Sequence, residues 1–155
     1  MKLTKHPKHM AAQRASKSMS WLLRHGAHSE GINIDEHGYV SIKDVISWLL
    51  KRGHVVSVAD IEQICRDDSK GRFSINGRKI RANQGHSITG LDTLQAYQPT
   101  GQLLHGTYSR HLDSIKSQGL RPMTRTHVHM IHDLYNQWHM IRQDINMYVL
   151  VDAVQ

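Results

Sequence analysis

Arginine and histidine residues gather in short segments of this chain where a packed core alone would require neither. Residues 125–129 read Arg-Thr-His-Val-His, and residues 104–107, about twenty positions earlier, read Leu-His-Gly-Thr. A guanidinium group offers paired donors to phosphate oxygens, and histidine can exchange protons near neutral pH. These two segments therefore indicate a site that handles phosphate.

The same residue types recur in the pair Arg24 and His25, at Arg72, and in the segment 84–87, which reads Gln-Gly-His-Ser. Arg24 and His25 fall in the last turn of an expected helix, where the helix dipole favours a cation. The dipole accounts for one basic residue there and explains less well an adjacent pair. The pair therefore joins the candidate phosphate residues.

The composition of the 155-residue chain suits a polyanionic partner. It holds 20 Lys and Arg against 13 Asp and Glu, a net charge of +7, together with 13 His. No apolar run approaches the ~18 residues of a membrane span, and the charged start has no apolar signal core. We therefore expect a cytoplasmic protein with no membrane partner. The single cysteine, Cys65, excludes an internal disulfide and a cysteine-based zinc site, and its surroundings favour a packing role.

The first part of the chain predicts three helices and a hairpin. Apolar spacing predicts a helix over 11–25 that stops at Gly26, a second helix runs from an N-cap at Ser41 to Gly53, and a third begins near Ser57. Asn76-Gly77, at the centre of residues 72–81, is a strong signal for a two-residue hairpin turn. Three helices followed by a hairpin are typical of a winged-helix lobe.

The expected hairpin gathers positive charge on one face. A turn at Asn76-Gly77 places Phe73 opposite Ile80 on the face toward the core. It places Arg72 opposite Arg81 on the other face, where Lys79 also lies. Like charges directly opposite each other destabilise a sheet. Either these side chains spread into water, or an anion lies between them.

The second part predicts a smaller mixed segment behind a polar linker at 91–102. Its expected elements are a strand at 103–104 that ends at the His-Gly-Thr segment, a short helix at 112–119, a strand containing Val128, a helix at 131–143 and a buried strand at 147–151. At strand spacing, His127 and His129 point to one face.

Five motifs, in order, resemble the NAD-dependent RNA 2′-phosphotransferase family, which removes the splice-junction 2′-phosphate in tRNA splicing. They are the segments 16–25, 70–73, 80–87, 104–107 and 125–129, and the resemblance runs from about residue 12 to the end of the chain. It implies an α+β fold with a winged-helix RNA-binding lobe over 1–92. An ADP-ribosyltransferase-like, β-rich lobe over 93–155 would bind NAD, and the active site would lie in the cleft between the lobes.

The chemistry implied by the resemblance consumes NAD as a co-substrate and uses no metal. The RNA 2′-phosphate attacks C1″ of the NAD ribose and expels nicotinamide. The ribose 2″-hydroxyl then attacks phosphorus, which releases 2′-hydroxyl RNA and ADP-ribose 1″,2″-cyclic phosphate. The expected partners are 2′-phosphorylated RNA, such as a tRNA splice junction, and NAD, and a monomer is sufficient.

The resemblance also assigns roles to residues. The catalytic set is Arg24, His25, Arg72 and Arg125. The NAD-binding set is His105, Gly106, Thr107 and His127, with His129 as the alternative to His127. The substrate-binding set is Arg81, Gln84, His86 and Ser87, although the segment 84–87 serves equally well as a brace for the hairpin.

The chain departs from the family pattern in two places. Residues 130–132 read Met-Ile-His where the family usually has Leu-Ser, which changes the expected shape of the NAD pocket. The family continues through further strands beyond the counterpart of residues 147–151, so we expect either that the second lobe is incomplete at its C-terminal end or that it is unusually small.

Three other functions fit parts of the pattern. ADP-ribose could go instead to an RNA terminal phosphate or to a protein, because the shape of the cleft selects the acceptor. A winged-helix module could bind nucleic acid without catalysis, with steep salt dependence. His127, His129 and His132 have spacing that zinc accepts, but the neighbouring Arg125 repels a cation.

Overall fold

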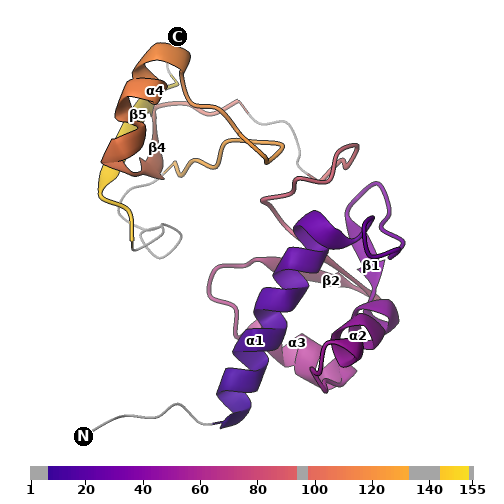
Figure 1. Cartoon of the computed structure of the whole chain (residues 1–155). Coiled ribbons are helices and arrows are strands. Elements are labelled where there is room, and N and C mark those ends of the chain that lie inside the picture. Colours follow the sequence, from indigo (N-terminus) through magenta and orange to yellow (C-terminus); the bar gives the residue numbers. More distant parts are fainter. Residues whose placement is uncertain (1–6, 94–97, 133–143, 154–155) are drawn as a thin grey trace, which may run out of the picture. The chain divides into compact units, whose positions relative to one another are not determined.

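The computed structural model describes residues 7–93, 98–132 and 144–153. Contacts between Cα atoms divide the chain into two compact units, Met1–Leu94 and Gln95–Gln155. Both units combine helices with a small antiparallel sheet (Figure 1), which confirms the predicted α+β class. Within the described residues, no helix has the length and apolar character needed to cross a membrane.

The first unit is built from three α-helices and three short strands (Figure 1). In chain order the elements are α1 (Pro7–Trp21), a π-helical turn η1 (Leu22–Gly26), β1 (Tyr39–Ser41), α2 (Ile42–Lys51), α3 (Val58–Arg66), β2 (Phe73–Asn76) and β3 (Lys79–Ala82).

The apolar spacing of the first helix is confirmed by burial. Ala15, Met19, Leu22 and Leu23 are completely buried. The regular helix ends earlier than predicted, because α1 gives way at Leu22 to a π-helical turn that continues to Gly26. The sequence offered no signal for this change of helix type.

The starts of the next two helices differ in kind. Ser57 caps α3 as predicted, since its hydroxyl accepts from the Asp60 N–H and the Asp60 carboxylate accepts from the Ser57 N–H. Ser41 precedes α2, but its side chain makes no capping hydrogen bond. Ser41 ends a strand, β1, that the sequence did not predict and that pairs with β3.

The sheet of the first unit has the strand order β1-β3-β2 and is antiparallel throughout. The predicted hairpin is present, but its register is shifted. Phe73 pairs with Ala82 and Ile75 with Ile80, so the expected pairs of Phe73 with Ile80 and of Arg72 with Arg81 are wrong. A shift of two residues keeps every side chain on its predicted face. Phe73 and Ile80 are therefore still buried.

The turn chemistry explains the register. Asn76 pairs with Lys79, so the two loop residues are Gly77 and Arg78, and Gly77 has a φ of 57°. A type I′ turn at Asn76-Gly77 would need positive φ at both residues, whereas Asn76 has none. Positive φ at the first loop residue alone fits a type II′ turn, which requires glycine there.

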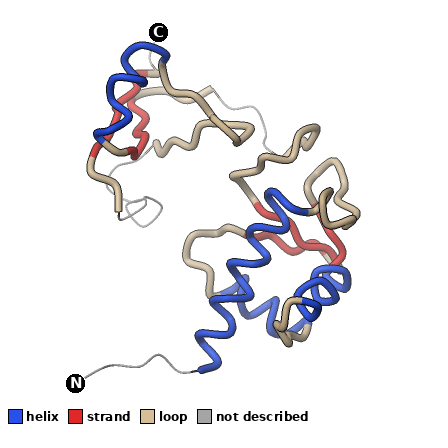
Figure 2. Tube along the Cα trace, in the orientation of Figure 1, coloured by secondary structure: helices blue, strands red, loops and turns tan. Residues whose placement is uncertain are grey.

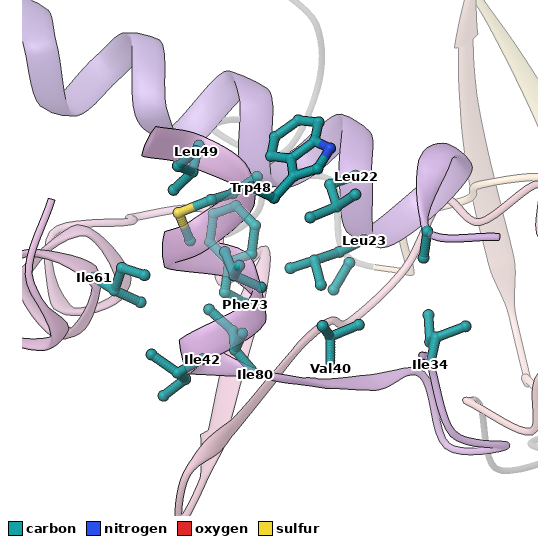
Figure 3. Packing of buried hydrophobic residues seen from close by; sticks show 14 of the residues in the cluster. Leu22, Leu23, Ile34, Val40, Ile42, Trp48, Leu49, Ile61, Phe73 and Ile80 are labelled. Atoms are coloured by element: carbon teal, nitrogen blue, oxygen red, sulfur yellow. The ribbon is translucent and has the colours of Figure 1, made fainter. Parts of the chain in front are cut away.

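The core of the first unit lies between the helices and one face of this sheet. Side chains from α1, η1, α2, α3 and the strands meet there, and Figure 3 shows Leu23 of η1, Leu49 of α2, Ile61 of α3 and Ile80 of β3. Trp48 covers the cluster from α2 and is 4% exposed. Because this core includes Leu22 and Leu23, it anchors the start of the π-helical turn.

The second unit pairs β4 (Gln102–Thr107) with β5 (Met147–Asp152) and carries a 3-10 turn (Ser109–His111) followed by α4 (Leu112–Gln118), as Figure 2 shows. The predicted short helix is confirmed, with Gly119 after its last residue at a φ of 73°. β4 extends through the His-Gly-Thr segment rather than ending there.

Three expectations for the second unit need correction or fall outside the description. Val128 lies in no strand, and the pairing in this stretch is an isolated bridge between Leu104 and Ile131. The predicted strand at 147–151 forms, but it is not buried: Tyr148 and Leu150 are 44% and 58% exposed. The expected helix at 131–143 begins with two residues that are not helical, and its remaining residues lie outside the described part.

The hairpin turn makes a testable distinction. We expect Gly77→Ala to destabilise the protein by about 1 kcal/mol, because alanine resists positive φ. Asn76→Ala should change stability by less than about 0.5 kcal/mol, because Asn76 sits in a normal strand conformation. Urea denaturation of the two variants measures both values. Equal losses of about 1 kcal/mol would contradict the observed turn and favour Asn76-Gly77.

Candidate active site

Arg24 and His25 both lie in the π-helical turn that follows α1. The turn is closed by a hydrogen bond from the Ala27 N–H to the Leu22 carbonyl, 2.9 Å long. Leu22, Leu23 and Gly26 are buried, whereas Arg24 is half-buried and His25 is exposed. Single π-helical turns are rare in proteins, and many of those that occur lie at functional sites. The turn therefore presents two adjacent basic side chains from an otherwise buried segment.

The segment 84–88 packs directly on this turn. The Arg24 carbonyl accepts hydrogen bonds from the N–H groups of Ser87 at 2.9 Å and Ile88 at 3.4 Å. The Ser87 hydroxyl lies 2.8 Å from Nδ1 of His25. Gly85 faces the Arg24 guanidinium: a Cβ at Gly85 would lie 3.5 Å from Arg24 Nε. Three predicted site residues, Arg24, His25 and Ser87, are thereby brought into one cluster, together with Gly85.

This arrangement bears on the two roles left open for residues 84–87. Ser87 and Gly85 brace the turn that carries Arg24 and His25. His86 is 2% exposed, and its ring lies near Gly38. Gln84 is half-buried. Contacts of Gln84, His86 and Ser87 with a substrate remain predictions.

Arg72 is held by a carboxylate from the loop after α3. Asp68 Oδ1 accepts from Nη2 of Arg72 at 2.7 Å and from Nε at 2.9 Å, and Asp68 Oδ2 accepts from the Arg72 backbone N–H. The Asp68 side chain is 3% exposed and that of Arg72 is 34% exposed. The Nε edge of the guanidinium is thus occupied, whereas Nη1 forms no hydrogen bond or ion pair with the described residues and can bind an anion.

The pKa of Asp68 reflects this contact. Burial by itself raises the pKa, but the hydrogen bonds and charge of Arg72 outweigh burial, so the pKa of Asp68 lies below 3.8. Asp68 is therefore ionised at neutral pH and keeps Arg72 oriented.

Lys79 and Arg81, the other two basic residues predicted for this face of the hairpin, have protein partners as well. Lys79 Nζ donates to Asp35 Oδ2 at 2.9 Å. Arg81 is half-buried; its Nη1 lies 3.4 Å from the His37 carbonyl, and its guanidinium carbon lies 5.0 Å from the centre of the Tyr39 ring. The sequence left a choice between water and an anion as the partner of these basic side chains. In the structure their partners are Asp68, Asp35 and the His37 carbonyl.

In the second unit, the His-Gly-Thr segment forms the C-terminal half of β4. His105 donates from Nδ1 to the backbone carbonyl of His129 at 2.8 Å. Gly106 pairs with Tyr148, and Thr107 is 8% exposed with its carbonyl accepting from the Asn146 N–H at 3.3 Å. The two predicted NAD-binding segments, 105–107 and 127–129, therefore meet through His105.

Arg125 and His127 lie in the loop between α4 and the Leu104–Ile131 bridge, and both are exposed. Nδ1 of His127 lies 2.9 Å from the Thr126 hydroxyl. Because this loop is not a strand, the spacing argument that placed His127 and His129 on one face does not apply. Neither histidine is favoured by the geometry over the other.

Two further groups bear on rival chemistry. Burial, followed by the charge of Asp68, raises the pKa of Cys65 to about 11, which agrees with a packing role. Among the described residues, His, Cys, Asp and Glu form no group of three that could hold a metal ion, and Nε2 of His132 lies 2.6 Å from the Thr100 carbonyl.

The ordered motifs and the basic turn can be compared with known proteins. The model of the RNA 2′-phosphotransferase, Tpt1/KptA family matches residues 10–155, nearly the whole chain. The chain belongs to this family. Arg24, Arg72, His105 and Arg125 all fall inside the matched region.

The family includes relatives from distant organisms. The chain is 40% identical over 126 residues to a protein of Burkholderia lata named probable RNA 2′-phosphotransferase, covering 79% of this chain and 65% of that protein. It is 34% identical over 157 residues to tRNA 2′-phosphotransferase 1 of Danio rerio, covering 92% and 69%. A Pyrococcus horikoshii relative is 34% identical over 143 residues. The chain spans about two thirds of the length of most of these relatives.

The Arg72–Asp68 contact yields a prediction about stability. We expect Asp68→Ala to cost about 2 kcal/mol at pH 7, because it removes a buried carboxylate that accepts three hydrogen bonds. The pKa of Asp68 is lowered on folding, so its contribution is present above pH 3.8 and is lost as the pH falls through the folded value. Urea midpoints should therefore differ at pH 7 and converge once the pH falls below the lowered pKa of Asp68.

Asp67→Ala is the matched control for this measurement. Asp67 is an exposed carboxylate that accepts from Gln63 rather than from an arginine. We expect a loss of about 0.5 kcal/mol or less. A loss at pH 7 as small for Asp68→Ala as for Asp67→Ala would contradict the role of Asp68.

Proposed function

We propose that this chain is an NAD-dependent RNA 2′-phosphotransferase that transfers an internal RNA 2′-phosphate to NAD. The products are 2′-hydroxyl RNA, nicotinamide and ADP-ribose 1″,2″-cyclic phosphate. The observation that carries the proposal is the cluster of Arg24, His25, Gly85 and Ser87 at the π-helical turn, in a chain that belongs to the RNA 2′-phosphotransferase family. The Danio rerio relative is named for tRNA, so we propose a tRNA junction as one substrate.

The proposal includes an architecture for each unit. The first unit would be a winged helix. The three helices followed by the β2–β3 hairpin support this interpretation, and β1 adds a third strand to the sheet of that hairpin. The second would be an ADP-ribosyltransferase-type lobe that binds NAD. The position of His105 within β4, hydrogen-bonded to the His129 segment, supports that reading.

In the first step, Arg24 and Arg72 bind the RNA 2′-phosphate. One of its oxygens forms a bond to C1″ of the NAD ribose while the bond from C1″ to nicotinamide breaks. Arginine suits this task because it stays charged at all relevant pH values and binds two phosphate oxygens at once. Asp68 holds Arg72 in place, and the backbone bonds of Ser87 and Ile88 hold the Arg24 segment. His105 and Thr107 would bind the ribose side of NAD.

In the second step, the ribose 2″-hydroxyl releases its proton to solvent as its oxygen bonds to phosphorus, and the bond from phosphorus to the RNA 2′-oxygen breaks. Arg125 would stabilise the charge that develops on the phosphoryl oxygens, a role that commonly contributes 10²- to 10³-fold in rate. His25 would supply the proton that the departing RNA 2′-oxygen takes up. The Ser87 hydroxyl, 2.8 Å from Nδ1 of His25, orients that ring.

The decisive experiment supplies an internally 2′-phosphorylated oligoribonucleotide with and without NAD. We expect removal of the 2′-phosphate only with NAD, together with ADP-ribose 1″,2″-cyclic phosphate as detected by mass spectrometry. The same yield is expected with a metal chelator present. Release of inorganic phosphate without NAD would overturn the proposed mechanism.

The proposed role of Arg125 predicts a defect in the second step that leaves the first step intact. In Arg125→Ala the first step should proceed while the second slows by at least about 100-fold, so that ADP-ribosylated RNA accumulates. Arg121→Ala is the matched control, because Arg121 is an exposed arginine of the same loop that donates to Gln118. Gel separation of the RNA species measures both variants. Loss of both steps in Arg125→Ala, with no intermediate, would place Arg125 in substrate binding instead.

A further inference from the structure

Trp21 is an exposed aromatic residue at the last position of α1, directly before the turn that holds Arg24 and His25. It is 45% exposed. One face of its ring stacks on Trp48, with ring centroids 6.1 Å apart and planes inclined by 15°. Trp48 is 4% exposed and is covered further by Arg52, whose guanidinium carbon lies 3.9 Å from the Trp48 ring centre. Trp21 therefore rests on a buried support and presents aromatic surface to its surroundings.

Gly26 fixes the position of this ring. A Cβ at residue 26 would lie 2.2 Å from Cζ3 of Trp21, far inside contact distance. The ring thus occupies space that any other residue at this position would fill. Because Gly26 ends the π-helical turn, one local structure sets both the ring of Trp21 and the backbone of Arg24 and His25.

Positive charge lies on both sides of Trp21 along the helix. Lys17 is one helical turn before it, and Arg24 and His25 follow within the next turn. Lys17, Arg14 and Arg72 line a groove of about 1000 Å³ that Asp60, Asp67 and Asp68 also line and that does not include Trp21. The order Lys17, Trp21, Arg24 and His25 along the chain, with an exposed aromatic ring between basic residues, matches single-stranded nucleic acid, whose phosphates bind the cations while a base stacks on the ring.

We infer that the outer surface of Trp21 stacks on a nucleobase close to the 2′-phosphate of the RNA strand, and that Lys17 contacts a backbone phosphate of the same strand. This inference rests on the proposed function, since that reaction supplies the RNA substrate. It assigns Trp21 to binding of the strand and not to the chemical steps.

The test compares Trp21→Leu with Trp21→Phe. Leucine keeps an apolar side chain against Trp48 but has no aromatic face, whereas phenylalanine has one. We expect the Kd for a labelled 2′-phosphorylated oligoribonucleotide, measured without NAD, to rise at least about fivefold in Trp21→Leu. In Trp21→Phe it should stay within about threefold of the parent value. The KM for NAD and kcat at saturating RNA should not change.

Leu50→Ala is the control, because it removes a 58% exposed apolar side chain from α2. It should leave the Kd unchanged. A Trp21→Leu variant that binds RNA as well as Leu50→Ala does would overturn the inference, as would equal losses for leucine and phenylalanine.

A series of oligonucleotides with one abasic nucleotide separates stacking from general weakening of the fold. At the position whose base stacks on Trp21, removing the base should weaken binding to the parent protein but have little further effect on Trp21→Leu. Additive losses at every position would contradict stacking. Lys17→Ala should show a different signature, a slope of log Kd against log salt reduced by roughly 0.7.

These measurements separate the inference from the proposed function. If the parent protein binds the oligonucleotide and shows the Trp21 effects but does not consume NAD, the reaction proposal fails and the binding inference stands. If NAD is consumed normally in every Trp21 variant with unchanged Kd and KM for RNA, the inference fails and the reaction proposal stands.

Discussion

The first unit depends on a hydrogen bond between segments 63 residues apart in sequence, in which the Arg24 carbonyl accepts the N–H of Ser87. Carbonyls in the last turn of a helix lack partners within the helix and must find them elsewhere. Here the segment that follows β3 supplies them. The end of α1 and the sheet are joined in this way, and the position of the Arg24 and His25 side chains follows from that junction.

Two arginines proposed to bind the same phosphate are held by different means. The Arg24 segment is fixed through its backbone, and Gly85 lies against its guanidinium. Arg72 is fixed through its side chain, by a nearly buried carboxylate that stays ionised. Fixing a charge before substrate arrives lowers the cost of reorganising it during reaction. The carboxylate also reduces the net attraction of Arg72 for phosphate, so its benefit lies in orientation rather than in added charge.

The spacing of apolar residues predicted most of the local structure, such as helix faces and turns, and little of the pairing between distant segments. The inward positions of α1, the capping box at Ser57 and the two faces of the hairpin follow from spacing and turn chemistry, and all are confirmed. Strand β1, with three residues, is too short to show a pattern. The π-helical turn leaves no trace, because its buried residues keep ordinary helical spacing. The Val128 prediction failed because a β-branched residue between two histidines imitates alternation without a pairing partner.

The pairing of charges in the hairpin changes which residues can bind an anion. Sequence spacing grouped Arg72, Lys79 and Arg81 as one cationic surface, but Asp68 and Asp35 neutralise the first two, and Arg81 packs against Tyr39 and the His37 carbonyl. A phosphate gains most where a cation keeps donors that no carboxylate occupies. By that criterion the hairpin face offers an anion fewer donors than the sequence spacing suggested. Arg72 would therefore contact the proposed phosphate through the donors that Asp68 does not occupy.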